Sequence, residues 1–397
     1  MHRDVFLTAI ALIAAPAAFA QPPLAVTFRG GVNLSTTATD QHGQTFTIAG
    51  LSGLTAIGSS LYAAVMDNSN KVVFISVSLG PTGAITSGVV SGGLTLADAR
   101  DFEDIAWTGP QRGTLLLSEE GTPSIREYSL ADGAFVGAFP SPAVFLSRRD
   151  NFGFESLSIR ADSAALWTAN EEALTADGPL STPAAGTVVR LVRYDAAGGS
   201  FSAGAQHAYL TQPMHGGAIR GGRSGVSQVL ALPDGRLLVL ERSLALASPL
   251  FQTRIYEVDP RSAMNVSGIA ALQGAAYTIV AKRLLYAGGQ NNLEGLCLGP
   301  ALISGGHALL GIVDDGDPIS INRLVSFELT GELSGACTPD FDGDGDIGTD
   351  ADIEAFFACL GGDCCVACGS ADFDGDGDTG TDLDIETFFR VLGGGEC

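Results

Sequence analysis

A hairpin bounded by acidic residues recurs along this chain, and no other feature limits the fold as strongly. In its clearest copy, residues 151–174, Glu155 precedes a short apolar run, a polar turn follows, and a second apolar run ends at Glu171 and Glu172. Two short apolar runs joined by a polar turn predict a β-hairpin. Four more copies carry these pairs at their two ends: Ser52 with Asp67, Glu103 with Glu119, Ser227 with Glu241, and Glu294 with Asp314.

Units of this kind recur every 50 to 72 residues, and such a period indicates a propeller or a solenoid. Each hairpin is followed by further strand-like runs separated by turn residues, which gives the four-stranded content of a propeller blade. The prediction is a mainly β chain with a β-propeller of five blades, a sixth with a degraded signal staying open. The fifth unit lacks an outer strand, and we expect residues 26–29 to supply it, because ring closure leaves no sheet edge unpaired.

The first twenty residues have the pattern of a secretory signal peptide. His2 and Arg3 precede an apolar run from Val5 to Ala14, and Ala18-Phe19-Ala20 follows. We therefore expect cleavage near Gln21 and export, so that the protein is secreted, periplasmic or at the cell surface. No later stretch reaches the roughly 18 unbroken apolar residues of a membrane helix, so no transmembrane span is predicted.

Acidic residues are concentrated at the C-terminal end. The net charge of −23 divides into −15 for residues 337–397, where sixteen Asp and Glu face one Arg, and −8 for the rest. Neither part has the clustered Lys and Arg that contacts with a phosphate backbone require, which disfavours a nucleic-acid partner.

Cysteine usage is equally uneven, with six of the seven cysteines after residue 336. In an exported protein these six favour disulfides, with 15 pairings open. Zinc binding by Cys365 and Cys368 is the alternative, but a second such pair is lacking. Cys297, flanked by Leu296 and Leu298, is interpreted as a small buried apolar side chain.

Two copies of a calcium-loop pattern, DFDGDGD from Asp340 and from Asp372, lie 32 residues apart in this tail. Carboxylates at alternate positions before a turn glycine and an amphipathic helix are typical of a Ca²⁺ loop. The apolar faces of the two helices, which include Phe356, Phe357, Phe388 and Phe389, are expected to pack together. The candidate Ca²⁺ ligands are Asp340, Asp342, Asp344, Asp346, Asp350, Asp352, Asp372, Asp374, Asp376, Asp378, Asp382 and Asp384.

The tail resembles the duplicated loops of dockerin modules. This resemblance implies an α-helical EF-hand pair over residues 337–397 and a cohesin-like or cell-surface protein as partner. The position where such a loop normally closes holds Ala351 or Leu383. Either the acid before it (Asp350, Asp382) or the acid after it (Asp352, Asp384) closes the loop, and the sequence leaves both open. So small a core is expected to depend on Ca²⁺ and disulfides.

Propeller geometry gives the hairpin acids a common location, because the innermost strands of all blades line one axial channel. Acids that crowd there raise one another's pKa unless a cation lies among them. The candidates are Ca²⁺ and arginines such as Arg220, Arg223 or Arg242. Structural salt bridges at blade turns are an equally weighted alternative. The expected rings are Glu103, Glu155 and Glu294, and Asp67, Glu119, Glu171, Glu241 and Asp314.

The motifs FEDIAW, NFGFESLSI with LWTANEEAL, LLVLERS, and LEGLCLGP with IVDDGD resemble the phytase-like family, described as esterase-like activity of phytase. The resemblance covers roughly residues 45–330, within a domain placed at residues 21–336. It implies a propeller and hydrolysis of phosphoesters or phosphodiesters. The chain departs from the family pattern at Asp104 and Ser156, where glycine usually follows the glutamate, and at Asp315, commonly Asn. The implied catalytic positions are Glu103, Glu155, Glu171, Glu241, Arg242, Glu294 and Asp314.

The chemistry expected from this resemblance is phosphoester hydrolysis on a phosphorylated small molecule. Carboxylate-bound Ca²⁺ would neutralise phosphoryl oxygens and activate water, and arginine would add bidentate contacts. No G-x-S-x-G elbow, Walker loop or H-E-x-x-H motif is present, and His215 is interpreted as a solvated loop residue. The alternative is a non-catalytic propeller of the cell envelope whose acids hold structural ions.

Overall fold

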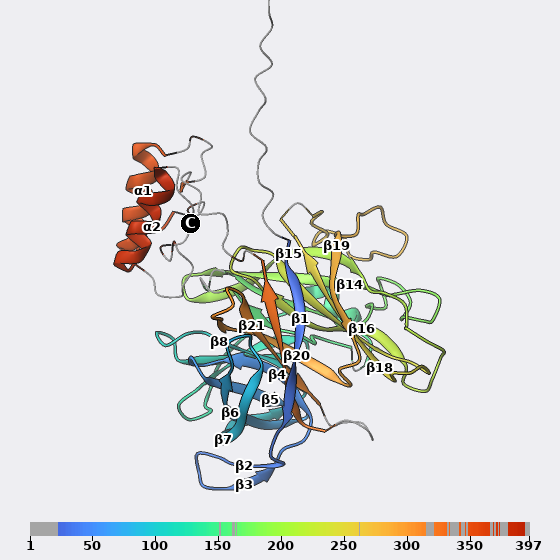
Figure 1. Cartoon of the computed structure of the whole chain (residues 1–397). Coiled ribbons are helices and arrows are strands. Elements are labelled where there is room, and N and C mark those ends of the chain that lie inside the picture. The colour runs from blue at the N-terminus through green and yellow to red at the C-terminus, as the bar shows by residue number, and fades with distance from the viewer. Residues whose placement is uncertain are drawn as a thin grey trace, which may run out of the picture.

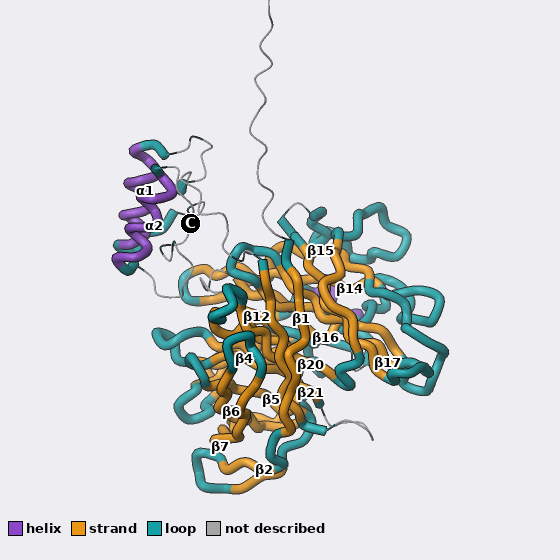
Figure 2. Tube along the Cα trace, viewed as in Figure 1, coloured by secondary structure: helices purple, strands orange, loops and turns teal. Residues whose placement is uncertain are grey.

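The computed structural model describes residues 23–150, 152–160, 163, 165–261, 263–314, 321–331, 333, 341–342, 346, 348–365, 368, 371, 373 and 380–393. Strands dominate it, and the α-helices α1 (Asp350–Leu360) and α2 (Asp382–Leu392) follow them in the chain (Figure 2). The signal segment 1–20 lies outside the described residues. Among the described residues, no helix combines the length and apolarity needed to span a membrane.

Five antiparallel sheets of four strands each form the body of the described structure. We number them as blades 1 to 5 in chain order of their innermost strands. Blade 1 contains β4 (Leu51–Ala56), β5 (Leu61–Met66), β6 (Ser69–Leu79) and β7 (Ile85–Arg100). Blade 2 contains β8 (Phe102–Trp107), β9 (Thr114–Glu119), β10 (Ser124–Ser129) and β11 (Phe135–Pro140). Blade 3 contains β12 (Ser158–Ile159), β13 (Ala165–Ala169), β14 (Val188–Ala197) and β15 (Ser200–Leu210). Blade 4 contains β16 (Arg223–Ala231), β17 (Leu237–Leu244), β18 (Phe251–Val258) and β19 (Lys282–Gly288). Blade 5 contains β20 (Leu293–Ala301), β21 (His307–Val313), β22 (Arg323–Thr330) and β1 (Ala25–Asn33). A short hairpin, β2 (Thr37–Thr39) with β3 (Thr45–Thr47), and the 3₁₀ turn η1 (Ala143–Ser147) complete this part.

The innermost strands contact one another in a closed cycle, β4 to β8, β12, β16, β20 and back to β4. Between each two neighbouring blades lies one buried apolar cluster, so every blade buries both faces. The protein is therefore a five-bladed β-propeller, as the repeat of hairpins predicts. A sixth blade is not found among the described residues.

Strand β1 closes the ring, and the prediction that the N-terminal segment completes the fifth blade is confirmed. It pairs antiparallel with β22 along its length, from Ala25 opposite Thr330 to Asn33 opposite Arg323. In Figure 1 β1 is blue and β21, in the same sheet, is orange, so opposite ends of the propeller sequence meet in one sheet. The ring of Phe28 packs edge-on against Phe327, with centroids 5.4 Å apart.

The two tail helices begin alike and pack on each other. Each begins with a capping box: the side chain of the N-cap threonine accepts a hydrogen bond from the backbone N–H of the aspartate three residues later, and the side chain of that aspartate accepts one from the threonine N–H. The capping box satisfies donors that a helix start leaves unpaired. Phe356 stacks on Phe388 with centroids 4.1 Å apart, so the expected small core forms. Phe357 and Phe389 were expected in it, but they are 46% and 44% exposed, because the next residue of a helix points about 100° away.

The tail cysteines form disulfides, as predicted, rather than a zinc site. Cys359 is bonded to Cys364, and Cys365 to Cys368. The remaining two cysteines of the predicted set, Cys337 and Cys397, lie outside the described residues. Cys297 is a buried free thiol, as the sequence indicates.

Candidate functional site

In each blade, the pairing between the innermost strand and its neighbour has a one-residue irregularity on the side of the innermost strand. Opposite Phe102 and Asp104 lie Glu119 and Ser118, so Glu103 is extra, and the other four hairpins gain a residue in the same way. A bulge of this kind re-aims a side chain and is common beside active sites. The residues at the five bulges are Ser52, Glu103, Glu155, Ser227 and Glu294.

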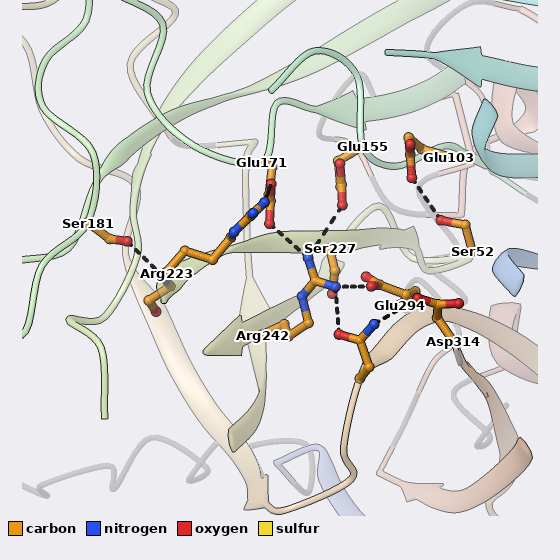
Figure 3. Close-up of polar contacts among 12 residues, drawn as sticks. Ser52, Glu103, Glu155, Glu171, Ser181, Arg223, Ser227, Arg242, Glu294 and Asp314 are labelled. Atoms are coloured by element: carbon orange, nitrogen blue, oxygen red, sulfur yellow. Dashed lines mark hydrogen bonds and ion pairs between the residues drawn. The ribbon is translucent and has the colours of Figure 1, made fainter. Parts of the chain in front are cut away.

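Arg242, on β17 of blade 4, lies at the centre of the acids that these irregularities bring together (Figure 3). Its Nη2 atom donates to Oε1 of Glu171 at 2.8 Å and lies 4.0 Å from Oε1 of Glu155. Its Nη1 atom donates to Glu294 and, at 2.8 Å, to Oδ1 of Asn292. One guanidinium group therefore holds carboxylates from blades 3 and 5.

A second arginine and a further aspartate extend this group. Arg223 donates from Nη1 to Oε2 of Glu171 at 2.9 Å, and its side chain is 30% exposed. Asp314 joins through Asn292, whose Nδ2 donates to its Oδ2 atom at 2.9 Å. The structure thus brings together Glu155, Glu171, Arg242, Glu294 and Asp314 of the predicted site residues.

Glu103 lies next to this group, in a cluster of acids from blade 2. Ser52 donates to its Oε2 atom at 2.9 Å. Oxygen atoms of Asp101, Glu103 and Glu120 all lie within 4.8 Å of one another. Burial, and then the charges of Glu120 and Asp101, raise the pKa of Glu103 well above its usual range. Burial and the charges of Glu171 and Asp101 raise the pKa of Glu120 to about 8.

Glu155 connects the blade-2 acids with the arginine group. Its side chain is 7% exposed. Burial raises its pKa well above the ordinary value, and the charges of Glu171 and Glu103 raise it further, while Arg242 lowers it. Glu155 and Glu103 lie beside each other, with the carboxylate of Glu155 pointing toward Arg242 and that of Glu103 toward Ser52 (Figure 3). A carboxyl group in this environment keeps its proton to a higher pH than an exposed one does.

Two acids expected in the second ring lie elsewhere. Glu241 accepts hydrogen bonds from the Tyr209 hydroxyl at 2.7 Å, from the Gln212 amide and from Lys282, and its side chain is fully buried there. It precedes Arg242 on one strand, and successive side chains of a strand point to opposite faces. The prediction that Glu241 joins the axial acids is therefore wrong.

Glu119 is held in the same structural manner, by Arg100 at 3.3 Å and by Ser124 at 3.1 Å. The next residue, Glu120, joins Asp101 and Glu103 in place of Glu119. The sequence interpretation missed Glu120, Asp101 and Asn292. Their only signal is that each lies within two residues of a position at a hairpin end.

Two loop residues that the sequence singled out have different surroundings. His215 was expected to be solvated, yet its Nδ1 atom lies 2.9 Å from the Ser243 hydroxyl and its Nε2 atom 2.9 Å from the Pro249 carbonyl oxygen. The ring therefore joins two loops and is corrected to a structural residue. Arg220 is exposed, and the arginines of the site are Arg223 and Arg242.

Asp104, at the departure from the glutamate-glycine step, forms the floor of the acidic end of the axis. It is 1% exposed, and its carboxylate accepts hydrogen bonds from the amides of Ile105 at 2.8 Å and Leu157 at 2.5 Å. Burial outweighs these bonds and raises its pKa to about 8. Gly53 makes room for it, because a Cβ atom there would lie 2.2 Å from Oδ1 of Asp104.

Beyond this floor the innermost strands line a cavity of about 220 Å³ at the other end of the axis. Its walls are mainly apolar and include Ile105, Leu157 and Leu296. Cys297 also lines it, and burial raises the pKa of its thiol to about 12. The charged groups are therefore confined to one end of the axis.

The tail loops are described only in part. Asp340, Asp344, Asp372, Asp374, Asp376 and Asp378 lie outside the described residues. Asp352 is fully buried and accepts from the Phe341 amide at 2.6 Å and the Thr349 amide at 2.7 Å. Asp384 has the equivalent bonds, whereas Asp350 and Asp382 are exposed. Asp352 and Asp384 thus tie each loop to its helix.

Fold and site together define a class: a five-bladed β-propeller with acids and arginines at one end of its axis. The chain belongs to the phytase-like family, described as esterase-like activity of phytase, whose model matches residues 47–317. The search of curated proteins finds no match.

Three solved structures that resemble the chain are distant from it in sequence. A hydrazine synthase of Kuenenia stuttgartiensis is 13% identical, with 69% of this chain and 59% of that chain covered and a TM-score of 0.34. The Dos1 propeller is 8% identical, with 74% and 71% covered and a TM-score of 0.33. The PQQ-bound aldose sugar dehydrogenase of Streptomyces coelicolor is 10% identical, with 78% and 100% covered and a TM-score of 0.35.

Proposed function

We propose that this protein is an exported hydrolase of phosphoesters or phosphodiesters whose active site is the acidic end of the propeller axis. The observation that carries the proposal is the convergence of Glu155, Glu171 and Glu294 on Arg242. Membership of the phytase-like family supports the same chemistry. Buried acids with raised pKa values beside arginines are typical of sites that bind anions and move protons.

Phosphate binding falls to the two arginines. One N–H group of Arg223 donates a hydrogen bond to Glu171, and the side chain is partly exposed. Its remaining N–H groups are therefore able to face a phosphoryl oxygen. Arg242 is held by Glu171, Glu294 and Asn292, which fixes its orientation. Guanidinium groups match the geometry of phosphate oxygens through paired hydrogen bonds.

Glu155 is the proposed proton carrier. When water attacks phosphorus and the P–O ester bond breaks, the leaving oxygen needs a proton. A carboxyl group whose pKa is raised keeps that proton to a higher pH and donates it in the transition state. Burial and neighbouring acids place Glu155 in this condition.

The donor set fits a hard divalent cation such as Ca²⁺. It consists of carboxylates, and Oδ1 of Asp101 is buried without a hydrogen-bond partner among the described residues. The axial acids that have no arginine partner would hold the ion. When bound, it supplies charge neutralisation at the phosphoryl oxygens and a lowered pKa for a water molecule.

The tail is proposed as a Ca²⁺-binding attachment module of the dockerin type, with a cohesin-like or cell-surface protein as partner. Two copies of the D-x-D-G-D loop and two capped helices support it. The signal-peptide pattern of residues 1–20 and the disulfides in the tail support export.

One observation favours the alternative, a non-catalytic propeller that binds a ligand at the cell envelope. Arg242 already meets Glu171, Glu294 and Asn292, as expected of a structural salt-bridge network. The hydrolase should turn over phosphate esters and the non-catalytic propeller should not, so one activity assay distinguishes the two functions.

The test is hydrolysis of a phosphomonoester and a phosphodiester chromogenic substrate by the full chain, with and without Ca²⁺. Glu155→Gln keeps the shape of the side chain but cannot exchange the proton, and we expect a loss of about 10²–10⁴-fold in kcat. Asp259→Asn, at a surface pair with Arg261, is the matched control and should retain full activity. Absence of turnover by the unmodified chain on both substrates would leave the non-catalytic alternative.

A further inference from the structure

Asp101 and Glu120, which the family resemblance did not assign, form a group with Glu103, and we propose that this group is a binding site for one Ca²⁺ ion. All three belong to blade 2 or its connections: Glu103 on β8, Asp101 just before it, and Glu120 just after β9. The site deepens the proposed hydrolase, and its catalytic meaning rests on that function. Ion binding itself is measured independently of turnover.

The spacing of the ligand atoms suits calcium. One oxygen from each residue lies within 4.8 Å of the others. Ca²⁺–oxygen distances are about 2.3–2.6 Å, so oxygens on either side of the ion lie up to about 5 Å apart, whereas Mg²⁺ at about 2.1 Å draws them closer. The set contains neither histidine nor cysteine, the ligands that favour zinc.

The three acids also lack a positive partner. In the part of the chain that the structure describes, no ion pair includes Asp101, Glu103 or Glu120. Some other buried acids of the propeller do have one: Glu127 binds Arg112, and Glu241 binds Lys282. Three neighbouring carboxylates without a counterion are unfavourable unless a cation arrives.

A second observation points to a ligand at the same place. The carboxylate of Glu155 is 7% exposed and makes no hydrogen bond among the described residues, and its nearest cation is the Nη2 atom of Arg242, 4.0 Å away. It lies beside Glu103 (Figure 3), and the charges of Glu103 and Glu120 act on it. A buried carboxylate oxygen normally has a partner, and Ca²⁺ takes six to eight oxygen ligands. Water molecules would complete the shell, and one of them would be the hydrogen-bond partner of Glu155, which keeps its proton.

The site end of the axis is then divided in two. The ion lies on the side of blade 2, and Arg242 and Arg223 lie on the side of blades 3 and 4. Glu155 is between them, close to both. A phosphoryl group in this space would meet a cation on one side and guanidinium donors on the other, an arrangement that neutralises its charge from both sides.

Thermal unfolding of the full chain tests the site, with tryptophan fluorescence as the signal. The chain has two tryptophans, Trp107 and Trp167, and both belong to propeller strands, so the signal excludes the tail. We expect Ca²⁺ to raise the Tm of the wild-type propeller by about 5 °C over the value in chelator. In Glu120→Gln the expected shift is absent, and Tm in chelator equals or exceeds that of wild type because repulsion is relieved.

Glu127→Gln is the matched control, since Glu127 is a buried glutamate of the same blade with an arginine partner. It should lower Tm in both conditions and retain the full Ca²⁺ shift. Counting bound ions by equilibrium dialysis gives a second measurement: Glu120→Gln should bind one ion fewer per chain, with the tail unchanged. If Ca²⁺ leaves the wild-type Tm unchanged, or if Glu120→Gln binds as many ions as wild type, the site is refuted.

These outcomes separate the ion site from the hydrolase. A Ca²⁺ shift that Glu120→Gln abolishes, together with no turnover on either phosphate substrate, keeps the ion site and removes the hydrolase. Turnover that chelator leaves unchanged, without a Ca²⁺ shift, keeps the hydrolase and removes the ion site.

Discussion

At the residue scale, Arg242 is the counterion of the axial acids. It neutralises Glu171 and Glu294 and lies near Glu155, and its side chain is 12% exposed. Arg242→Met leaves these carboxylates buried without their cation, so we expect a loss of about 3–5 kcal/mol in the free energy of unfolding. Urea unfolding followed by tryptophan fluorescence measures it. Arg261→Met, at an exposed pair with Asp259, should change stability by less than about 0.5 kcal/mol.

Asp104 makes stability depend on pH. Its pKa of about 8 in the folded protein lies above the value of about 3.9 in an unfolded chain, so folding favours the protonated form. The stability that this group contributes is fully present below about pH 4 and is lost as the pH rises through about 8.

The propeller should therefore unfold at progressively lower urea concentration as the pH is raised from 5 to 8. In Asp104→Asn the same series should have a shallower slope, because this carboxyl no longer titrates. The variant is also expected to be less stable at pH 5, since the amide nitrogen cannot accept the hydrogen bond from Ile105 or Leu157 that an oxygen of the carboxyl group accepts. A variant whose slope equals that of wild type would show that other groups cause the pH dependence.

Strand parity explains which site residues the sequence could predict. Glu103, Glu155 and Glu294 were assigned to the axis because they open their hairpins, and they lie there. Glu241 and Glu119 lie at the closing ends of their hairpins and were assigned to the axis for the corresponding reason. Bulges on the partner strands, however, shift the register of pairing by one residue. Arg242 and Glu120 face the axis instead. A one-residue bulge leaves no clear mark in a single sequence.

At the element scale, closure by β1 is the contact between the two ends of the propeller sequence. It was predictable because the fifth hairpin lacks an outer strand, and unpaired strand edges are avoided. Along β1, Val26 is buried in the apolar cluster between blades 4 and 5, while Thr27 is exposed. Adjacent residues of one strand therefore offer a matched pair of positions.

Val26→Asp places an unpaired charge in that cluster, and we expect a loss of more than about 3 kcal/mol in the free energy of unfolding. Thr27→Asp adds the same charge to the solvent side of the strand and should cost less than about 1 kcal/mol. Urea titrations of the two variants give the comparison. Equal stabilities would mean that β1 is not required to close the ring.

At the scale of the whole molecule, the chain joins two units that are stabilised differently. The propeller buries an apolar cluster between every two blades. The tail has one small cluster centred on Phe356 and Phe388, two disulfides, and an acidic composition for which we propose bound Ca²⁺. Below about 70 residues, such disulfides and metals provide stability that a core alone does not.

Removing these supports should therefore unfold the tail alone. With chelator and reductant together, we expect the far-ultraviolet circular dichroism of α1 and α2 to disappear while tryptophan fluorescence of the propeller stays native. Chelator alone should remove part of the helical signal and reductant alone another part, because metal and disulfides stabilise the same small core. Readdition of Ca²⁺ to the chelated, oxidised protein should restore the helices. A helical signal that ignores both reagents would show that the phenylalanine core suffices, and fluorescence that changes with it would show that the two units unfold together.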